Sequence, residues 1–177
     1  MWRKFSLDIA INSLQEHDAE ELYQFEKNNR LFFEQMVPSR GEDYYKFETF
    51  QLKHRELLAE QQEEKSKFYL IRDNSGNIVG RINLVDIDTT NNIAEVGYRV
   101  GKEYGGKGIG ATALKLLLET EISVQKIKAK TTTNNIASQK VLEKSGFKQI
   151  CISDDMFEMN GQILQFIHYL WKKDSNH

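Results

Sequence analysis

A glycine-rich loop carries the clearest chemical potential in the sequence. Residues 105–111 read Gly-Gly-Lys-Gly-Ile-Gly-Ala, between an alternating segment at 93–100 and an amphipathic segment at 111–121. Glycine leaves backbone N–H groups free of Cβ atoms, and the N-terminus of a following helix contributes about half a positive charge. This arrangement predicts a site for a phosphate or pyrophosphate group.

The spacing of the glycines argues against two common nucleotide-binding loops. A P-loop ends in Gly-Lys-Ser/Thr, and neither Gly-Lys pair near this loop is followed by serine or threonine. Gly106, Gly108 and Ala111 satisfy the dinucleotide pattern Gly-x-Gly-x-x-Gly/Ala, but that pattern opens its fold and is followed about 20 residues later by an acidic residue. Here several predicted strands precede the loop, and the next predicted strand, 126–132, contains no acid. A dinucleotide fold is therefore disfavoured.

Composition and charge limit the classes of partner. The 177 residues predict one domain, 1–177, and 24 basic against 26 acidic side chains give a formal net charge of −2, which argues against nucleic acid as the main partner. No run approaches the roughly 18 apolar residues of a membrane span, and no signal peptide is evident. One cysteine and four histidines lack metal-ligand spacing, so no metal site is expected. We expect a cytoplasmic protein without a membrane partner.

Hydrophobic periodicity defines the elements that must position the loop. Strands are predicted where apolar residues alternate, and helices where they recur every three or four positions. Asp18 is the expected N-cap of the first helix. The predicted order is strand 5–14, helix 18–28, helix 42–64, strands 67–72 and 78–88, strand 93–100, helix 111–121, strand 126–132, a helix capped by Asn134 or Asn135 that closes at Gly146, and a hairpin of 147–152 with 162–171 that turns near Asn160-Gly161. This order predicts an α+β fold, a mixed and mostly antiparallel sheet with helices on both faces.

This order of elements, with the glycine loop leading into a helix, resembles the GNAT superfamily of acyl-CoA N-acyltransferases over nearly the whole chain. Two segments carry the resemblance. Residues 105–110 lie over the family's pyrophosphate signature Arg/Gln-x-x-Gly-x-Gly/Ala, although Gly105 replaces the long polar side chain at its first position. Residues 135–147 resemble the family's coenzyme-side helix and its Glu-Lys-x-Gly-Phe ending.

The resemblance implies acetyl-CoA as co-substrate, without a metal. It implies that Tyr98, Arg99 and Val100 offer main-chain groups to the pantetheine arm and the thioester, where their strand splays from its neighbour. The implied contacts from the following helix are Asn135 and Ser138. The implied pyrophosphate-binding residues are Gly105, Gly106, Lys107, Gly108, Ile109, Gly110 and Ala111.

Two residues receive catalytic roles from the resemblance. Glu95 stands where a glutamate acts as general base in histone-acetylating relatives, usually through water; a cross-strand ion pair with Arg81 or another cation is the alternative. Many relatives carry a proton-donating tyrosine where this chain has Leu142. Resemblance to the RimL-like group implies that Ser138 is instead the proton donor to the leaving thiolate or its hydrogen-bond partner. A serine that only bonds its own backbone is the alternative there. Glu158 is a second candidate base.

Finer likenesses indicate the acceptor. Segments 18–22, 28–34, 94–98 and 160–161 resemble the RimJ/RimL-type enzymes, and this resemblance implies acetylation of protein N-termini, often of ribosomal proteins. An α-amine with a pKa of about 8 is partly neutral at pH 7, whereas a lysine amine with a pKa of about 10.4 is almost entirely charged. The residues implied to wall the acceptor cleft are Phe32, Phe33, Met36, Tyr44 and Tyr45.

Other functions and assemblies stay open from the sequence. The enzyme alternative is acetylation of a small amine, such as a polyamine, an aminoglycoside or an amino acid. Glu34, Glu42 and Asp43 leave room for an acidic cleft that would suit a polycation. The alternative from another class is a catalytically silent acyl-CoA-binding domain. Both a monomer and a homodimer are compatible with the sequence.

Overall fold

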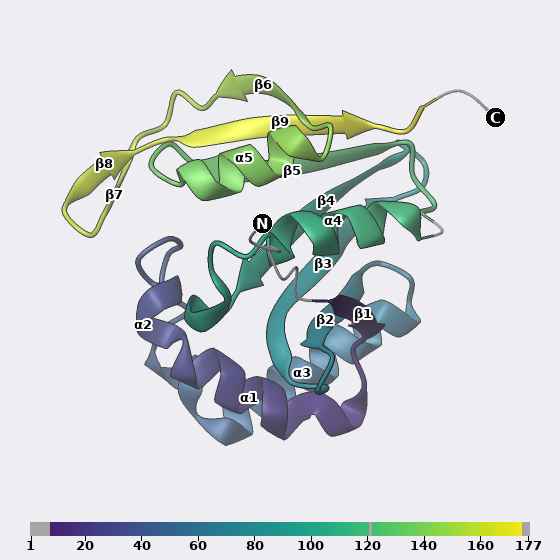
Figure 1. Cartoon of the computed structure of the whole chain (residues 1–177), viewed down its shortest axis with the longest axis vertical. Coiled ribbons are helices and arrows are strands. Elements are labelled where there is room, and N and C mark those ends of the chain that lie inside the picture. Colours follow the sequence, from purple (N-terminus) through teal and green to yellow (C-terminus); the bar gives the residue numbers. More distant parts are fainter. Residues whose placement is uncertain (1–7, 121, 175–177) are drawn as a thin grey trace, which may run out of the picture.

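A seven-stranded mixed sheet organises the computed structural model, which describes residues 8–120 and 122–174. Its strands and those of a separate ribbon are β1 Ile9–Ser13, β2 Lys67–Asp73, β3 Ile78–Asp88, β4 Ile93–Val100, β5 Lys126–Thr132, β6 Lys148–Ile152, β7 Phe157–Met159, β8 Gln162–Leu164 and β9 Phe166–Lys172. The sheet runs in the order β1-β2-β3-β4-β5-β9-β6, and β7 pairs with β8 (Figure 1). Among these strands β4 and β5 pair in parallel and the other neighbours are antiparallel, so the prediction of a mixed, mostly antiparallel sheet is confirmed.

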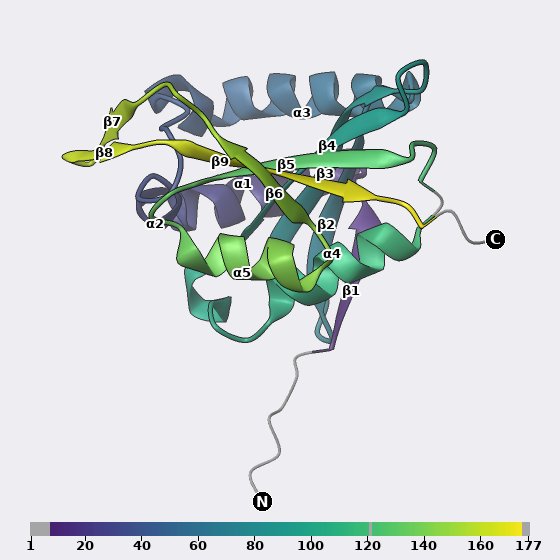
Figure 2. The same cartoon turned by 90° about the horizontal axis from the view of Figure 1, so that it is seen from above.

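Helices cover both faces of the sheet, as predicted. They are α1 Ala19–Asn28, α2 Arg30–Phe33, α3 Phe47–Gln62, α4 Ile109–Glu119 and α5 Ile136–Lys144, with 3-10 turns at Glu16–Asp18, Glu42–Tyr45 and Lys102–Tyr104. Seen edge-on, α3 lies on one side of the sheet and α4 and α5 lie on the other (Figure 2). Alternation along β2 serves both layers, because Leu70 joins the core beneath α1 and α3 whereas its neighbour Ile71 joins the core beneath α4.

Strands β4 and β5 separate along their length. Their parallel pairing runs from Ile93–Lys126 to Glu95–Lys128 and goes no further in the described chain. On its other edge β4 stays paired with β3 to its end. Residues 96–100 therefore border an opening toward β5, which confirms the splay that the sequence resemblance implies.

The helix predicted over 42–64 is wrong at its start. A 3-10 turn at Glu42–Tyr45 is followed by Lys46 in an extended conformation, with φ −88° and ψ 130°, and α3 begins only at Phe47. The Phe47 ring then packs against Tyr23 of α1, with ring centroids 5.1 Å apart. A packing requirement between two helices overrides the local periodicity here, because periodicity within one segment carries no record of its neighbours.

Asp18 does not cap the first helix, contrary to the prediction. Its carboxylate accepts the backbone N–H of Gln15 at 2.8 Å and the guanidinium of Arg72 at 2.9 Å. The N-terminus of α1 has no side-chain cap. The partner that redirects Asp18 comes from β2, far away in the sequence.

The remaining boundaries lie close to their predicted positions. Gly146, with φ +86°, follows α5, and Asn135 caps its start. The helix predicted over 111–121 begins at Ile109 and ends at Glu119. Residues 5–7 of the predicted first strand, together with residue 121, lie outside the described residues.

The predicted C-terminal hairpin divides into two pairings. β6 does pair with β9, but the turn at Asn160-Gly161 joins the short strands β7 and β8. Asn160 and Gly161 have φ +53° and +75°, the sign that a two-residue type I′ turn requires at both positions. The Asn160 amide also donates to the carbonyl of Glu34 at 3.1 Å. The β7-β8 ribbon is thereby attached to the segment that follows α2.

Candidate active site

A groove of about 390 Å³ lies at the splay between β4 and β5. It is bordered by the end of β4, the glycine loop with the start of α4, one side of α5 along its length, and α2 with the residues after it. From the predicted coenzyme set it is lined by Tyr98, Arg99, Val100, Gly105, Gly106, Gly108, Ile109, Gly110, Ala111, Asn135 and Ser138. Segments that are distant in the sequence thus converge on one groove, which is the arrangement that the predicted coenzyme contacts require.

The glycine loop has the geometry of an anion cradle. Gly106 and Gly108 adopt φ +71° and +76°, a left-handed conformation that other residues enter only with strain. Gly108 is the N-cap of α4 and supplies no side-chain cap, so the first N–H groups of the helix are left for a ligand. Gly105 has φ −62°, a backbone angle that any residue adopts, so the backbone at this position does not require glycine. Glycine here only removes the long side chain of the signature.

Lysines add positive charge near the cradle. Lys140 and Lys144 line the groove from successive turns of α5. The sequence reasoning missed them, although their i,i+4 spacing on a predicted helix was readable. Lys107 is exposed and does not line the groove. Its Nζ lies 5.5 Å from the centre of the Tyr104 ring, and Tyr104 does line the groove. The lysines that line the groove therefore come from α5, and Arg99 of β4 lines it as well.

Two of the residues that line the groove, one on β4 and one on α5, bring their hydroxyl groups within hydrogen-bonding distance of each other. The Ser138 Oγ and the Tyr98 hydroxyl lie 3.1 Å apart, and the Tyr98 hydroxyl also donates to the Ser138 carbonyl at 3.3 Å. Burial raises the pKa of Tyr98 to about 12, so its phenol stays protonated at physiological pH. Asn135 orients this turn of α5, because its side chain accepts the Ser138 N–H at 3.1 Å. Leu142 is buried in the core, 1% exposed, and takes no part.

Tyr98 was predicted only as a main-chain contact, so its hydroxyl is a candidate functional group that the sequence prediction did not include. The signal was available. Strand alternation places Tyr98 on the face shared with Ala94 and Val96, which belong to the core beneath α4 and α5. A polar tip at the far end of that row must point past the core toward the start of α5.

Glu95 lies at the fork where β4 and β5 part. Its carboxylate is 3.9 Å from the Lys130 Nζ, and the side chain is 34% exposed. Strand alternation turns it to the face opposite Tyr98, so it does not line the coenzyme groove. The alternative, a cross-strand ion pair, is confirmed with another cation, Lys130 of β5, and not with Arg81, because Val85 stands across from Glu95 in β3. A carboxylate at this fork can receive a proton from a group that approaches from the α1 and α3 side.

Arg81 belongs instead to a buried cluster. Glu26 of α1, fully buried, accepts the Arg81 guanidinium at 2.8 Å and that of Arg99 at 3.1 Å. Burial alone would raise the pKa of Glu26, but the two guanidinium groups outweigh it and lower that pKa below its usual value. The Arg99 guanidinium lies 4.7 Å from the centre of the Phe33 ring. The cluster therefore fixes α1 and α2 to the two strands beside the groove.

The predicted acceptor-cleft residues divide between two cavities. Phe32, Phe33 and Met36 line the coenzyme groove, whereas Tyr44 lines a second cavity on the other face of the sheet. Tyr45 lines neither; its carbonyl accepts the Tyr23 hydroxyl at 2.8 Å. Glu158, the second candidate base, is exposed on β7 and lines neither cavity.

Comparison with known proteins gives the class that this fold and site define. Residues 8–148 match the acetyltransferase (GNAT) domain family. Because the match spans most of the chain, the protein belongs to this family and is an acyltransferase. No helix within residues 8–120 and 122–174 is long and apolar enough to cross a membrane. The same ranges contain no group of three or more acidic, histidine or cysteine side chains that could hold a metal ion.

Individual relatives agree with this class. The chain is 31% identical over 162 residues to the probable N-acetyltransferase YjcK of Bacillus subtilis (strain 168), covering 86% of this chain and 87% of YjcK. The ribosomal-protein-S5-alanine acetyltransferase of Vibrio fischeri has a TM-score of 0.86 at 21% identity, covering 94% of each chain. RimL, a ribosomal L7/L12 α-N-protein acetyltransferase in complex with coenzyme A, has a TM-score of 0.85 at 19% identity, covering 95% of this chain and 96% of its own. At these identities the two solved structures share the fold with this chain.

Proposed function

We propose that this enzyme transfers an acetyl group from acetyl-CoA to the α-amine at the N-terminus of a protein. The observation that carries the proposal is the splayed groove with its glycine cradle at one end. The left-handed Gly106 and Gly108, the uncapped start of α4 and the lysines of α5 fit a pyrophosphate group. The open edge of β4 fits an extended arm, because residues 96–100 have no partner from β5 in the described chain.

The chemistry assigned to the residues is general acid–base help at two points. Acetyl-CoA, when bound, supplies an already activated thioester, so the protein has to position it, remove a proton from the amine and assist the leaving sulfur. Glu95 at the fork accepts the proton, through water. On the other face Ser138, hydrogen-bonded to Tyr98, donates to the thiolate. The strand β4 lies between these groups, and its free edge holds the reacting carbonyl.

The carboxylates that could have formed an acidic cleft are already paired, which favours an α-amine over a polycation as acceptor. Glu34 and Glu42 both pair with Arg30, and Asp43 pairs with Lys46 at 2.6 Å. Each of these carboxylates has a cation of this chain beside it, and none of them lines either cavity. The names of the ribosomal-protein acetyltransferases with this fold support a protein N-terminus as acceptor. Such acceptors are consistent with the predicted cytoplasmic location, which stays a prediction.

An acceptor screen with thiol release as the readout tests the proposal. It compares peptides with free and with acetylated N-termini, spermidine, an aminoglycoside and free amino acids, each with acetyl-CoA. We expect release only with free peptide N-termini. Thiol release with the small amines but not with the peptides would show that the acceptor is a small amine. Coenzyme binding without thiol release from any acceptor would support a catalytically silent acyl-CoA-binding domain.

A further inference from the structure

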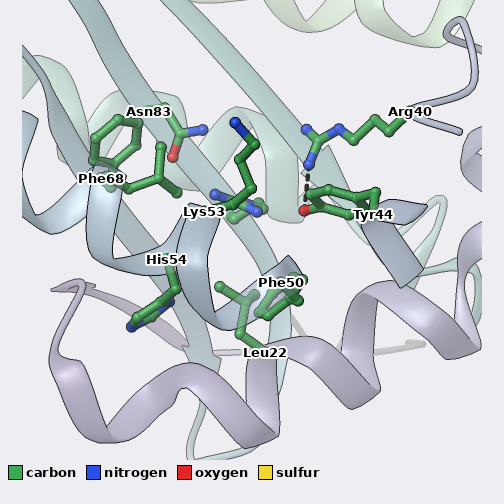
Figure 3. Close-up of a pocket in the computed structure, with 10 residues that line it drawn as sticks. Leu22, Arg40, Tyr44, Phe50, Lys53, His54, Phe68 and Asn83 are labelled. Atoms are coloured by element: carbon green, nitrogen blue, oxygen red, sulfur yellow. Dashed lines mark hydrogen bonds between the residues drawn. The ribbon is translucent and has the colours of Figure 1, made fainter. Parts of the chain in front are cut away.

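A second cavity, of about 380 Å³, lies on the face of the sheet that α3 covers (Figure 3). Its floor on β3 includes Arg81 and Asn83, which stand directly across from Arg99 and Gly97 of β4. Side chains at such positions have Cβ atoms about 5 Å apart. Gly97 has no Cβ, and an atom added there would meet nothing within 4 Å. The cavity therefore lies beside β4 at Gly97, which is the next residue after Glu95 on the same face of that strand.

Three residues that line this cavity each carry a buried polar atom without a partner in the described part of the chain. Within the described residues no hydrogen bond reaches the Arg81 Nε, the Asn83 Oδ1 or the His54 Nδ1. The Arg81 side chain is 5% exposed and uses a different nitrogen for Glu26. Buried polar groups in native proteins are nearly always paired, so unpaired ones that line a cavity indicate a ligand or ordered water.

The charge of the cavity selects the sign of that ligand. Arg40, Lys53 and Arg81 line it, and no carboxylate does so within the described chain. Figure 3 shows the polar ends of Lys53, Asn83 and Arg40 turned toward the same side of the cavity, with the Arg40 guanidinium bonded to the Tyr44 hydroxyl at 2.5 Å. The Lys53 ammonium also bonds Glu56 at 2.8 Å, on the exposed side of α3. The nearest buried carboxylate, Glu26, is already shared by two arginines.

We propose that this cavity binds a carboxylate of the acceptor, the side chain of an aspartate or glutamate close to the N-terminus that is acetylated. The proposal rests on the proposed function, since it places the amine at the Glu95 fork. The carboxylate accepts from Arg81 and from the exposed cations Arg40 and Lys53, while the acceptor's backbone N–H donates to the Asn83 Oδ1. The apolar side chains of Phe50, Leu57 and Phe68 surround its methylene groups.

Binding of matched peptides tests this specificity without requiring turnover. Amidated alanine tetrapeptides with aspartate at the first, second or third position are compared with their asparagine twins by calorimetry, with and without coenzyme A. We expect one aspartate peptide to bind about tenfold more tightly than its twin, because a charge-assisted hydrogen bond is stronger than a neutral one. Raising the salt concentration to about 0.5 M should shrink the difference. Equal binding of every pair, or tighter binding of the asparagine twins, overturns the inference.

Charge variants locate the preference. Lys53→Gln and Arg40→Gln should each bring the aspartate-to-asparagine ratio to within about threefold while the asparagine twin binds as before, and Lys53→Glu should invert the preference. Lys115→Gln is the matched control, because Lys115 is also an exposed helical lysine with an intrahelical carboxylate neighbour, and it lies on α4. A preference that survives both substitutions overturns the assignment to this cavity.

Thiol release separates this inference from the proposed function. Release with free peptide N-termini but no preference for aspartate leaves the function standing and removes the cavity's role. An aspartate preference in binding, without thiol release from any peptide, leaves the carboxylate site standing and removes the proposed acetyltransferase function.

Discussion

The Tyr98 and Ser138 hydroxyls are the most specific chemical feature of the groove. Ser138 is held from two sides, because Asn135 accepts its backbone N–H and Tyr98 lies 3.1 Å from its Oγ. Burial raises the pKa of Tyr98 to about 12, so its phenol stays protonated at physiological pH and keeps its hydrogen-bonding contact with Ser138. A lone serine would lack this orientation. We propose that the pair does the work of the tyrosine that, by resemblance, many relatives carry at the position of Leu142.

Ser138→Ala should lower kcat by about ten- to a hundredfold, within the range usually credited to general acid–base help. Tyr98→Phe should have a similar effect, and the double variant should be no slower than the worse single one, since residues that act as a unit are not additive. Calorimetry should show unchanged acetyl-CoA affinity. Ser145→Ala is the control, because the Ser145 hydroxyl only bonds the Val141 carbonyl of its own helix. Unchanged turnover in both single variants would mean that the thiolate leaves unaided.

Glu95→Gln should lower the acetylation rate most below pH 7.5, and at pH 9 the rate of the variant should come closer to that of the wild type. A base matters only while the amine arrives protonated, and an α-amine with a pKa of about 8 is mostly neutral at the higher pH. The pH profile of kcat/KM with a peptide acceptor measures this. Glu158→Gln, which alters the other candidate base, should leave the profile unchanged. A uniform loss at all pH values would assign Glu95 a structural part with Lys130 instead.

At the scale of elements, periodicity and turn residues were sufficient for the order of the longer strands and helices, but not for α2 or for the short strands β7 and β8. The glycine loop with the start of α5 was sufficient to locate the groove. Register was not available from the sequence. Arg81 was a reasonable partner for Glu95 until the pairing placed Val85 across from it. The same limit hid the break at Lys46 and the second cavity, because both depend on α3 and α1 packing against strands that are distant in the chain.

The first turn of α4 offers a test of the cradle that avoids backbone strain. A Cβ added to Gly110 would lie 3.6 Å from the Tyr98 ring and 3.8 Å from Val141, both ordinary contacts. Gly110→Ala should therefore bind acetyl-CoA within about threefold of the wild type. Gly110→Val adds two methyl groups beside Tyr98 and Val141, which line the groove, and should weaken acetyl-CoA binding by more than about tenfold. Thermal denaturation should show that the variant is still folded. Tight binding by Gly110→Val in calorimetry would place the coenzyme elsewhere.

At the scale of the whole molecule, one ion cluster separates the two cavities and joins the layers. Arg99 lines the coenzyme groove, Arg81 lines the second cavity, and Glu26 of α1 bonds both. The cluster connects the helical layer over β1–β4 to the strand that borders the splay. The two proposed binding sites therefore share a buried carboxylate, and the stability of that connection can be measured separately from activity.

Glu26→Gln should lower the free energy of unfolding by about 3–5 kcal/mol, because removing one partner leaves buried guanidinium charge uncompensated. Urea denaturation at pH 7 measures the change, and Glu20→Gln is the control, since Glu20 is exposed on the same helix. The pH dependence has a defined sign. A carboxyl whose folded pKa is lowered stabilises the fold above its unfolded pKa of 4.5 and loses that contribution as pH falls through the folded value. The stability difference between wild type and Glu26→Gln should therefore be constant from pH 7 to about 5 and should narrow below pH 4.5. A difference that persists unchanged into strong acid would show that the variant loses packing around α1 rather than charge.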